Sequence, residues 1–233
     1  MQKKILIIVP AYNEEESIQN VLQSLHATSM PYDIIVINDG STDATSQLAK
    51  EIKNTIVIDL PTNIGIGGAV QTGFKYAYRN NYDIVVQFDG DGQHEAKEII
   101  KIVTPIIINN TNCVIGSRFL DTTEGFKSTF IRRVGIKVFQ YVNSILINQK
   151  ITDNTSGFRA YNRDAIKLFA YDYPMDYPEP EAVIMLGKNN YSIEEISVLM
   201  HERMGGESSI SGLQPIYYMT KVLLSIFMTY LRK

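Results

Sequence analysis

Residues 83–94 have the sequence Asp83-Ile84-Val85-Val86-Gln87-Phe88-Asp89-Gly90-Asp91-Gly92-Gln93-His94, in which a mainly apolar run is followed by two aspartates separated by glycine. A short apolar run bounded by turn-forming residues is typical of a buried strand in a parallel sheet. Similar runs recur along the chain, and longer segments of helical pattern separate them. The stretch therefore indicates a strand that delivers polar side chains to one edge of an α/β sheet.

Regular alternation of strands and helices extends over the first half of the chain. The predicted strands are Ile5–Val9, Asp33–Ile37, Thr55–Asp59, Asp83–Phe88 and Asn112–Ile115. The predicted helices are Glu14–His26, Thr42–Lys53, Gly67–Arg79 and Glu95–Asn109, with capping residue types such as Ser41 and Asn63 near their starts. Such alternation predicts a Rossmann-like, mostly parallel central sheet flanked by helices. After residue 117 the pattern becomes irregular and more helical.

Composition limits the class of protein. A chain of 233 residues with 45% hydrophobic and 20% charged residues fits one large folded domain. The net charge of −3 gives no electrostatic reason to expect a nucleic-acid partner. Cys113 is the single cysteine, which excludes an internal disulfide and suits a reducing, cytoplasmic location. The first apolar run ends at Pro10 without a cleavage site, and no run approaches the roughly 18 residues of a transmembrane helix.

Polar residues directly after the strands are the candidates for a ligand site, because such sheets bind ligands beyond the carboxyl ends of their strands. Asp89 and Asp91 flank a glycine that relaxes the turn, so their carboxylates can share one hard cation such as Mg²⁺ or Mn²⁺. Gln93 and His94 are close enough in sequence to assist. The alternative is an Asp-Gly turn on a solvated loop.

Two further segments point to a nucleotide. Asp39 follows the second strand, where its carboxylate can accept hydrogen bonds from a base or ribose, while Ser41 is the expected helix cap. The run from Asn63 to Gly68 fails the G-x-G-x-x-G fingerprint at Val70, and we expect it to form a loop and helix start near a nucleotide. The motifs of P-loop NTPases, zinc proteases and α/β-hydrolases are absent from the sequence.

Three segments in order resemble the family 2 glycosyltransferases with the GT-A fold: Val9-Pro10-Ala11-Tyr12-Asn13-Glu14-Glu15, Asn38-Asp39-Gly40-Ser41-Thr42-Asp43 and Asp89-Gly90-Asp91-Gly92-Gln93-His94. Three more resemble the branch containing dolichyl-phosphate mannose synthase and bacterial polyprenyl-phosphate glycosyltransferases: Ile115-Gly116-Ser117-Arg118-Phe119, Asp153-Asn154-Thr155-Ser156-Gly157-Phe158-Arg159 and Arg203-Met204-Gly205-Gly206-Glu207-Ser208-Ser209. The resemblance covers residues 3–210, expected as one catalytic domain with a nucleotide-sugar half (1–117) and an acceptor half (118–210).

The resemblance also implies roles for individual residues. The UDP- or GDP-linked sugar would bind Pro10, Ala11, Tyr12, Glu14, Asp39, Gly68, Asp89 and Gly90. Mg²⁺ or Mn²⁺ would be held by Asp89, Asp91 and Gln93. Arg118 and Arg203 would act with Asp91 in catalysis, and the acceptor phosphate would meet Arg132, Arg133 and Ser209. The implied reaction inverts the anomeric carbon, while metal and arginine stabilise the departing nucleoside diphosphate.

The acceptor decides whether a base is needed. A polyprenyl phosphate oxygen is already anionic, whereas a hydroxyl of a surface glycan would need a carboxylate from Asp153, Glu179 or Glu181. One of the two glutamates could instead merely complement a helix dipole. Transfer to lipid phosphate is the leading hypothesis and transfer to a hydroxyl is the alternative. A sugar nucleotidyltransferase and a non-catalytic nucleotide-sugar sensor are more distant alternatives.

Two apolar segments predict a contact outside the domain. Residues 126–150 mix apolar and basic side chains, which suits either a helix on an anionic membrane surface or packing on the catalytic domain. Residues 211–233 form an apolar helix expected to contact the bilayer, a small membrane protein or a second subunit. Many polyprenyl-phosphate members carry transmembrane helices after this point, and this sequence does not. We expect a cytoplasmic protein at the inner face of the membrane.

Overall fold

A single mixed sheet forms the centre of the computed structural model, which describes residues 3–120, 142, 144–201 and 214–232. Its strand order is β3-β2-β1-β4-β6-β5-β7. The strands are β1 (Ile5–Ala11), β2 (Asp33–Asn38), β3 (Thr55–Asp59), β4 (Ile84–Gln87), β5 (Cys113–Ser117), β6 (Arg159–Asn162) and β7 (Ile193–Ser197).

All neighbouring strands are parallel except at β6, which runs antiparallel to both β4 and β5. The register pairs Ala11 of β1 with Asn38 of β2, and Ile8 of β1 with Gln87 of β4. The carboxyl ends of β1, β2 and β4 therefore meet at one edge of the sheet. This is the edge at which the sequence predicts the ligand site.

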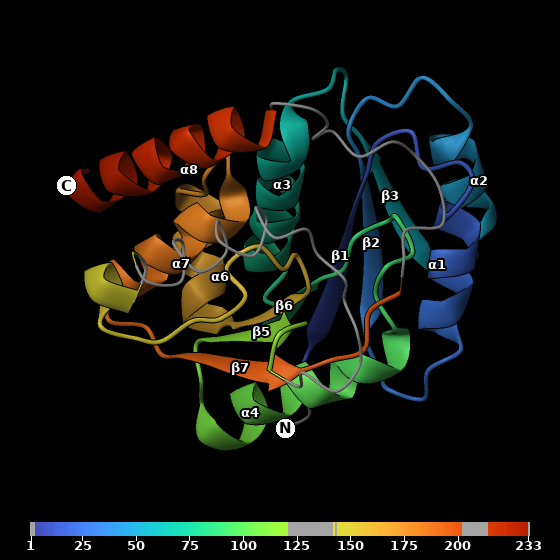
Figure 1. Cartoon of the computed structure of the whole chain (residues 1–233). Helices are drawn as coiled ribbons and strands as arrows, with labels where there is room; N and C mark the ends of the chain where they lie inside the picture. Colours follow the sequence, from blue (N-terminus) through green and yellow to red (C-terminus); the bar gives the residue numbers. More distant parts are fainter. Residues whose placement is uncertain (1–2, 121–141, 143, 202–213, 233) are drawn as a thin grey trace.

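Helices cover both faces of the sheet (Figure 1). Strand side chains alternate between the two faces, so Ile7 and Val9 belong to one core cluster while Leu6 and Ile8 belong to the other. The first face packs against α1 (Ile18–His26), α2 (Thr45–Glu51) and α4 (Ile99–Asn109), the last preceded by a 3₁₀ turn at Ala96–Glu98. The second packs against α3 (Gly65–Arg79), α6 (Arg163–Tyr171) and α7 (Pro178–Lys188).

The last helix, α8 (Gln214–Leu231), lies on the outside of α7 (Figure 1). Val222 and Ile226 are buried in the core cluster beneath it. Thr229 Oγ1 donates to Glu181 Oε2 on α7 at 2.7 Å, which adds a polar contact between the two helices. Within the described ranges, no helix combines the length and apolarity needed to cross a bilayer.

The five predicted strands and four predicted helices are confirmed, with shifted ends. One predicted cap is wrong. Ser41 Oγ accepts a hydrogen bond from the Asn13 backbone N–H at 3.0 Å, and the start of α2 is instead held by Asp43, whose Oδ1 accepts from the Thr45 N–H at 3.0 Å. Asn63 does contribute at the start of α3, because its Oδ1 accepts from the Gly65 N–H at 3.0 Å.

Candidate functional site

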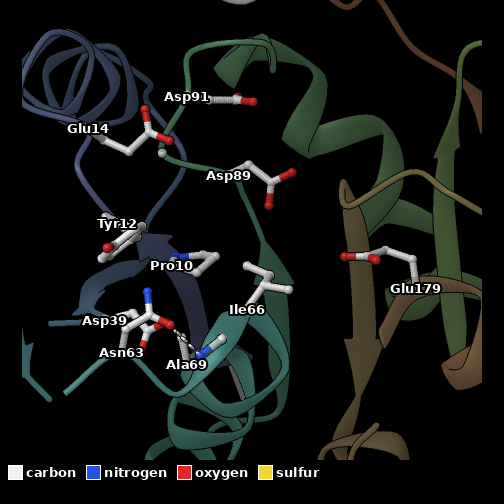
Figure 2. A pocket seen from close by; sticks show the side chains of 13 residues that line it. Pro10, Tyr12, Glu14, Asp39, Asn63, Ile66, Ala69, Asp89, Asp91 and Glu179 are labelled. Carbon is white, nitrogen blue, oxygen red and sulfur yellow. Dashed lines mark hydrogen bonds between the residues drawn. The ribbon is translucent and has the colours of Figure 1, made fainter. Parts of the chain in front are cut away.

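A pocket of about 340 Å³ opens at the carboxyl edge of the sheet (Figure 2). Its wall comes from the segments that follow β1, β2 and β4, from the start of α3, and from the first turn of α7. The lining residues are Pro10, Ala11, Tyr12, Glu14, Asp39, Asn63, Gly65, Ile66, Ala69, Asp89, Gly90, Asp91 and Glu179. The pocket thus joins predicted nucleotide-binding residues to the segment with the two predicted metal ligands, Asp89 and Asp91, which is called the metal loop below.

Asp89 and Asp91 both face this pocket (Figure 2). Asp91 is 9% exposed, and its Oδ1 accepts from the Gln93 backbone N–H at 3.0 Å, which fixes the turn after β4. Asp89 Oδ2 lies 3.1 Å from His94 Nε2. Burial opposes ionisation of Asp89, but the contact with His94, with Arg118 nearby, holds its pKa below the ordinary value. Asp89 is therefore an anion.

His94 is itself held firmly under the loop. Its ring stacks on Phe158 with centroids 5.0 Å apart and forms a T-shaped pair with Phe88 with centroids 5.3 Å apart. Because the Asp89 carboxylate is ionised and can only accept, the His94 Nε2–H is the donor between them. His94 does not line the pocket. It therefore orients the Asp89 carboxylate from outside the pocket.

Gly157 lets the Asp89 carboxylate take this position. A Cβ at Gly157 would lie 2.4 Å from Asp89 Oδ2 and 3.0 Å from Oδ1, so any other residue would force the carboxylate to move. The segment before β6 is thus packed directly against the metal loop. The sequence alone does not indicate this role, because it depends on the absence of a Cβ at Gly157 next to Asp89, which is far away in the chain.

The acidic pair fits a hard divalent cation whose coordination shell is completed by substrate oxygens. Two carboxylates on one loop supply the oxygen ligands that Mg²⁺ and Mn²⁺ prefer. Among the described residues, no three His, Cys, Asp or Glu side chains are grouped as a metal site. Mg²⁺ commonly binds in this way, through one or two carboxylates together with substrate phosphates. Gln93, the third predicted ligand, does not line the pocket.

The opposite end of the pocket has the features of a nucleoside site. Tyr12 is 46% exposed and presents its ring at the rim. Asp39 is 3% exposed, and its two oxygens accept from the backbone N–H groups of Ile64 at 2.8 Å and Gly65 at 2.9 Å. Asp39 therefore fixes the start of α3 while it lines the pocket. Gly68, predicted to bind nucleotide, instead packs against the Ile64 side chain and does not line the pocket.

The start of α3 supplies pocket residues that the sequence did not single out. Asn63, Gly65, Ile66 and Ala69 all line the wall between the Asp39 end and the metal loop. The sequence predicted that this run passes near a nucleotide, but it could not say which side chains face the ligand. Helical spacing of Ile66 and Ala69, three residues apart, was the available signal.

Arg118 and Asp153 form a buried ion pair beside the pocket. Arg118 Nε and Nη2 each lie 2.8 Å from an oxygen of Asp153, which is fully buried. Burial opposes the charge on Asp153, but Arg118 outweighs it and keeps the Asp153 pKa below its ordinary value. Glu195 Oε1 also accepts from the Asp153 N–H at 2.7 Å. Neither member of the ion pair lines the pocket, and Asp153 is oriented toward Arg118.

The two candidate glutamates of α7 point in different directions, and only one of them faces the pocket. Glu179 lines the pocket with its carboxylate directed toward the metal loop (Figure 2). Burial raises the pKa of Glu179 above its ordinary value; Arg159 opposes that rise and Asp89 adds to it. Glu181 faces away, where its Oε1 accepts from the Tyr177 N–H at 3.1 Å and its Oε2 from Thr229. Of the two, only Glu179 is in the site.

Four predicted residues, Arg132, Arg133, Arg203 and Ser209, lie outside the described residues. The chain leading toward Arg203 is nevertheless joined to the metal loop. The His201 N–H donates to the Gln93 carbonyl oxygen at 2.8 Å, and Met200 pairs with His94 as an antiparallel bridge.

Comparison with known proteins agrees with this geometry. The model of glycosyl transferase family 2 matches residues 6–169. A UDP-N-acetylglucosamine–dolichyl-phosphate N-acetylglucosaminyltransferase of Methanococcus voltae is 34% identical over 84% of this chain and 85% of its own. A polyprenol monophosphomannose synthase of Mycolicibacterium smegmatis is 28% identical over 90% and 82%, respectively.

The fold has solved counterparts. A glucosyl-3-phosphoglycerate synthase from Mycobacterium tuberculosis, in complex with Mn²⁺ and UDP-glucose, has a TM-score of 0.70 at 18% identity and covers 98% of this chain and 79% of that one. At this identity the likeness concerns the fold alone. The family match spans well over half of the sequence and includes the strand-end clusters that line the pocket. This chain belongs to glycosyl transferase family 2.

Proposed function

We propose that this protein transfers a sugar from a nucleoside-diphosphate sugar to a polyprenyl phosphate, with Mg²⁺ or Mn²⁺ as cofactor. The observation that carries the proposal is the convergence of Asp89 and Asp91 with the nucleoside-type residues around one pocket. The relatives named for dolichyl or polyprenol phosphate, matched along most of both chains, support a lipid-phosphate acceptor.

Asp89 and Asp91 would hold the cation on the donor diphosphate. When bound, it supplies positive charge that stabilises the departing nucleoside diphosphate. The Mn²⁺ and UDP-glucose named for the Mycobacterium tuberculosis enzyme support this pairing of metal and donor. Tyr12 and Asp39 would bind the nucleoside at the other end of the pocket, and Arg118, oriented by Asp153, would add positive charge near the acidic loop.

The proposed transfer is a direct displacement. An acceptor phosphate oxygen forms a bond to the anomeric carbon, while the bond between that carbon and the diphosphate oxygen breaks and its electron pair leaves with the nucleotide. Because the acceptor oxygen is anionic near neutral pH, no proton has to be removed. Stabilising the leaving group is then the main task of the site.

A hydroxyl acceptor is the second candidate, and Glu179 is the observation in its favour. Its carboxylate faces the pocket and burial raises its pKa above the ordinary value, which is the direction that favours a general base. With a hydroxyl acceptor, Glu179→Gln should lower kcat by about 10²–10⁴-fold. With a lipid-phosphate acceptor the same change should cost far less, so one variant distinguishes the two acceptors.

We also propose that α8 contacts the membrane at its cytoplasmic face. Leu224, Phe227, Met228 and Leu231 are each more than half exposed, and their spacing puts them on one side of the helix. Such a stripe suits the interfacial layer of a bilayer. Co-sedimentation with anionic lipid vesicles tests this: Phe227→Glu should reduce binding, and equal binding by the variant would contradict the contact.

The central experiment is a panel of UDP- and GDP-sugars with Mn²⁺ or Mg²⁺, offered with polyprenyl phosphate or with glycan hydroxyl acceptors. We expect transfer to polyprenyl phosphate with release of a nucleoside diphosphate. Asp91→Ala should abolish metal-dependent turnover, and normal turnover by that variant would contradict the proposed site. Pyrophosphate release from a nucleoside triphosphate and a sugar phosphate, offered separately, would instead indicate a nucleotidyltransferase. Metal-dependent donor binding without turnover would indicate a sensor.

A further inference from the structure

Arg159 is a fully buried cation that the proposed chemistry leaves without a role. It is the first residue of β6, where its backbone pairs with Gln87 of β4 and Ile115 of β5. Its guanidinium donates to three backbone carbonyl oxygens: Nε to Ser156 at 2.7 Å, Nη2 to Asn154 at 2.9 Å and Nη1 to Glu179 at 2.8 Å. The strand places Arg159 beside the carboxyl end of β4, and the three hydrogen bonds fix its side chain.

This arrangement is costly to build and demanding in shape. Moving a charged group out of water is strongly unfavourable unless hydrogen bonds replace its hydration. Here carbonyl dipoles do so, and the planar guanidinium reaches all three acceptors in a fixed fork. A lysine ammonium has no such fork and cannot span carbonyls that lie in different directions. An apolar side chain would fill the space but would leave the carbonyls without these donors.

The three carbonyls belong to two segments that carry groups of the site. Residues 153–157 hold Asp153, the partner of Arg118, and Gly157, which packs against Asp89. The first turn of α7 carries Glu179, which faces the metal loop across the pocket (Figure 2). The segments are about 20 residues apart in the chain, and Arg159 joins them directly by hydrogen bonds.

We infer that Arg159 is a positioning residue that fixes the Asp153 segment, which orients Arg118, relative to the first turn of α7, which carries Glu179. The inference rests on the transferase function proposed above. Arg159 does not line the pocket, whose nucleotide end is built from the ends of β1 and β2 and the start of α3. Its loss should therefore affect the reacting arrangement more than it affects nucleotide binding.

The test compares Arg159→Gln and Arg159→Lys with Arg163→Gln as a matched control. Arg163 also donates to backbone carbonyls, those of Tyr82 at 2.9 Å and Tyr78 at 3.2 Å, but these lie beyond the amino-terminal end of β4, away from the pocket. Each variant is assayed for kcat and acceptor KM, for the Kd of UDP and of GDP with Mn²⁺ by calorimetry, and for its unfolding midpoint.

We expect Arg159→Gln to lower kcat by about 100-fold, the loss typical of a misplacement near 1 Å in a reacting arrangement. The nucleotide Kd should stay within about threefold of the wild type, because a change in the reacting arrangement lowers kcat and not ground-state binding. Arg159→Lys, which keeps the charge but only a single donor nitrogen, should recover part of the loss. Arg163→Gln should lower the unfolding midpoint while kcat stays at the wild-type level.

Several results would overturn the inference. Wild-type kcat in Arg159→Gln would remove the positioning role, and so would parallel losses of kcat, nucleotide binding and stability, since these indicate support of the fold alone. If Arg159→Gln does not fold, Arg159→Lys decides: a lowered kcat with unchanged nucleotide Kd supports the role, and wild-type kcat refutes it. Absence of transfer by the wild-type protein would be a failure of the proposed function and is seen before any variant is made.

Discussion

Gly157 offers a direct test of the acidic loop as a metal site, because the change to alanine adds one carbon at a known place. The new Cβ would lie 2.4 Å from Asp89 Oδ2, whereas real Cβ contacts essentially never fall below 3.0 Å, so the oxygen must retreat by about 0.6 Å. Metal–ligand distances tolerate only about 0.2 Å. The Gly157 backbone is outside the left-handed region, so alanine adds no backbone strain.

We therefore expect Gly157→Ala to weaken Mn²⁺ binding by about 10–100-fold, the usual effect of disturbing a group that supports a metal ligand. In free energy this is about 1.4–2.7 kcal/mol. The measurement is nucleotide binding and turnover titrated against Mn²⁺ concentration. Turnover should recover at high Mn²⁺, because the ligand is displaced and not removed.

The matched control is Gly187→Ala, whose Cβ would lie 2.3 Å from Ile147 Cβ, away from the pocket. Such overpacking costs about 1–3 kcal/mol of stability. We expect this control to lower the unfolding midpoint and leave the Mn²⁺ titration unchanged. An unchanged Mn²⁺ titration in a folded Gly157→Ala protein would refute the assignment of Asp89 as a ligand.

Two predictions concern pH. The pKa of Glu179 is raised above its ordinary 4.5, so above that pH the native state holds more protons than the unfolded state, and the free energy of unfolding falls as pH rises. Glu179→Gln should remove this pH dependence, measured by urea unfolding at a series of pH values. The same pH dependence in the variant and the wild type would contradict the prediction. The pKa of Asp153 is lowered, so the stabilisation that its ionised carboxylate gives the fold is present at neutral pH and is lost as pH falls. Asp153→Asn breaks the buried pair with Arg118 and should lower the free energy of unfolding by about 3–5 kcal/mol at pH 7, and by less in acid. A cost that stays constant down to pH 3 would count against the second prediction.

The sequence predicted the parallel half of the sheet because buried parallel strands are continuous apolar runs. It missed β6 and β7. β6 is only four residues long and has Arg159 and Asn162 at its two ends, and β7 contains Glu194 and Glu195 in succession. β6 is a strand because it lies between β4 and β5, and β7 because it extends the edge at β5. Tertiary pairing outweighed local pattern in both cases.

The site was predictable where chain order is enough to locate it. Asp39, Asp89 and Asp91 follow strands whose carboxyl ends must meet, so the sheet alone brings them together. Gly157 and Arg159 were visible only as members of a motif. Their partners, Asp89 and the Glu179 carbonyl, lie far away in the sequence, and no local pattern reports such a contact.

The sequence was enough to show that the two glutamates of α7 face different ways, but not which of them faces the pocket. Residues two apart on a helix differ in direction by about 200°, so Glu179 and Glu181 cannot face one ligand once the segment is helical. What the sequence lacked was the phase of the helix. The structure supplies it: α8 covers the side that carries Glu181, through Thr229, and this leaves Glu179 toward the pocket. The side of α7 that contacts α8 thus carries Glu181, and the side that faces the pocket carries Glu179.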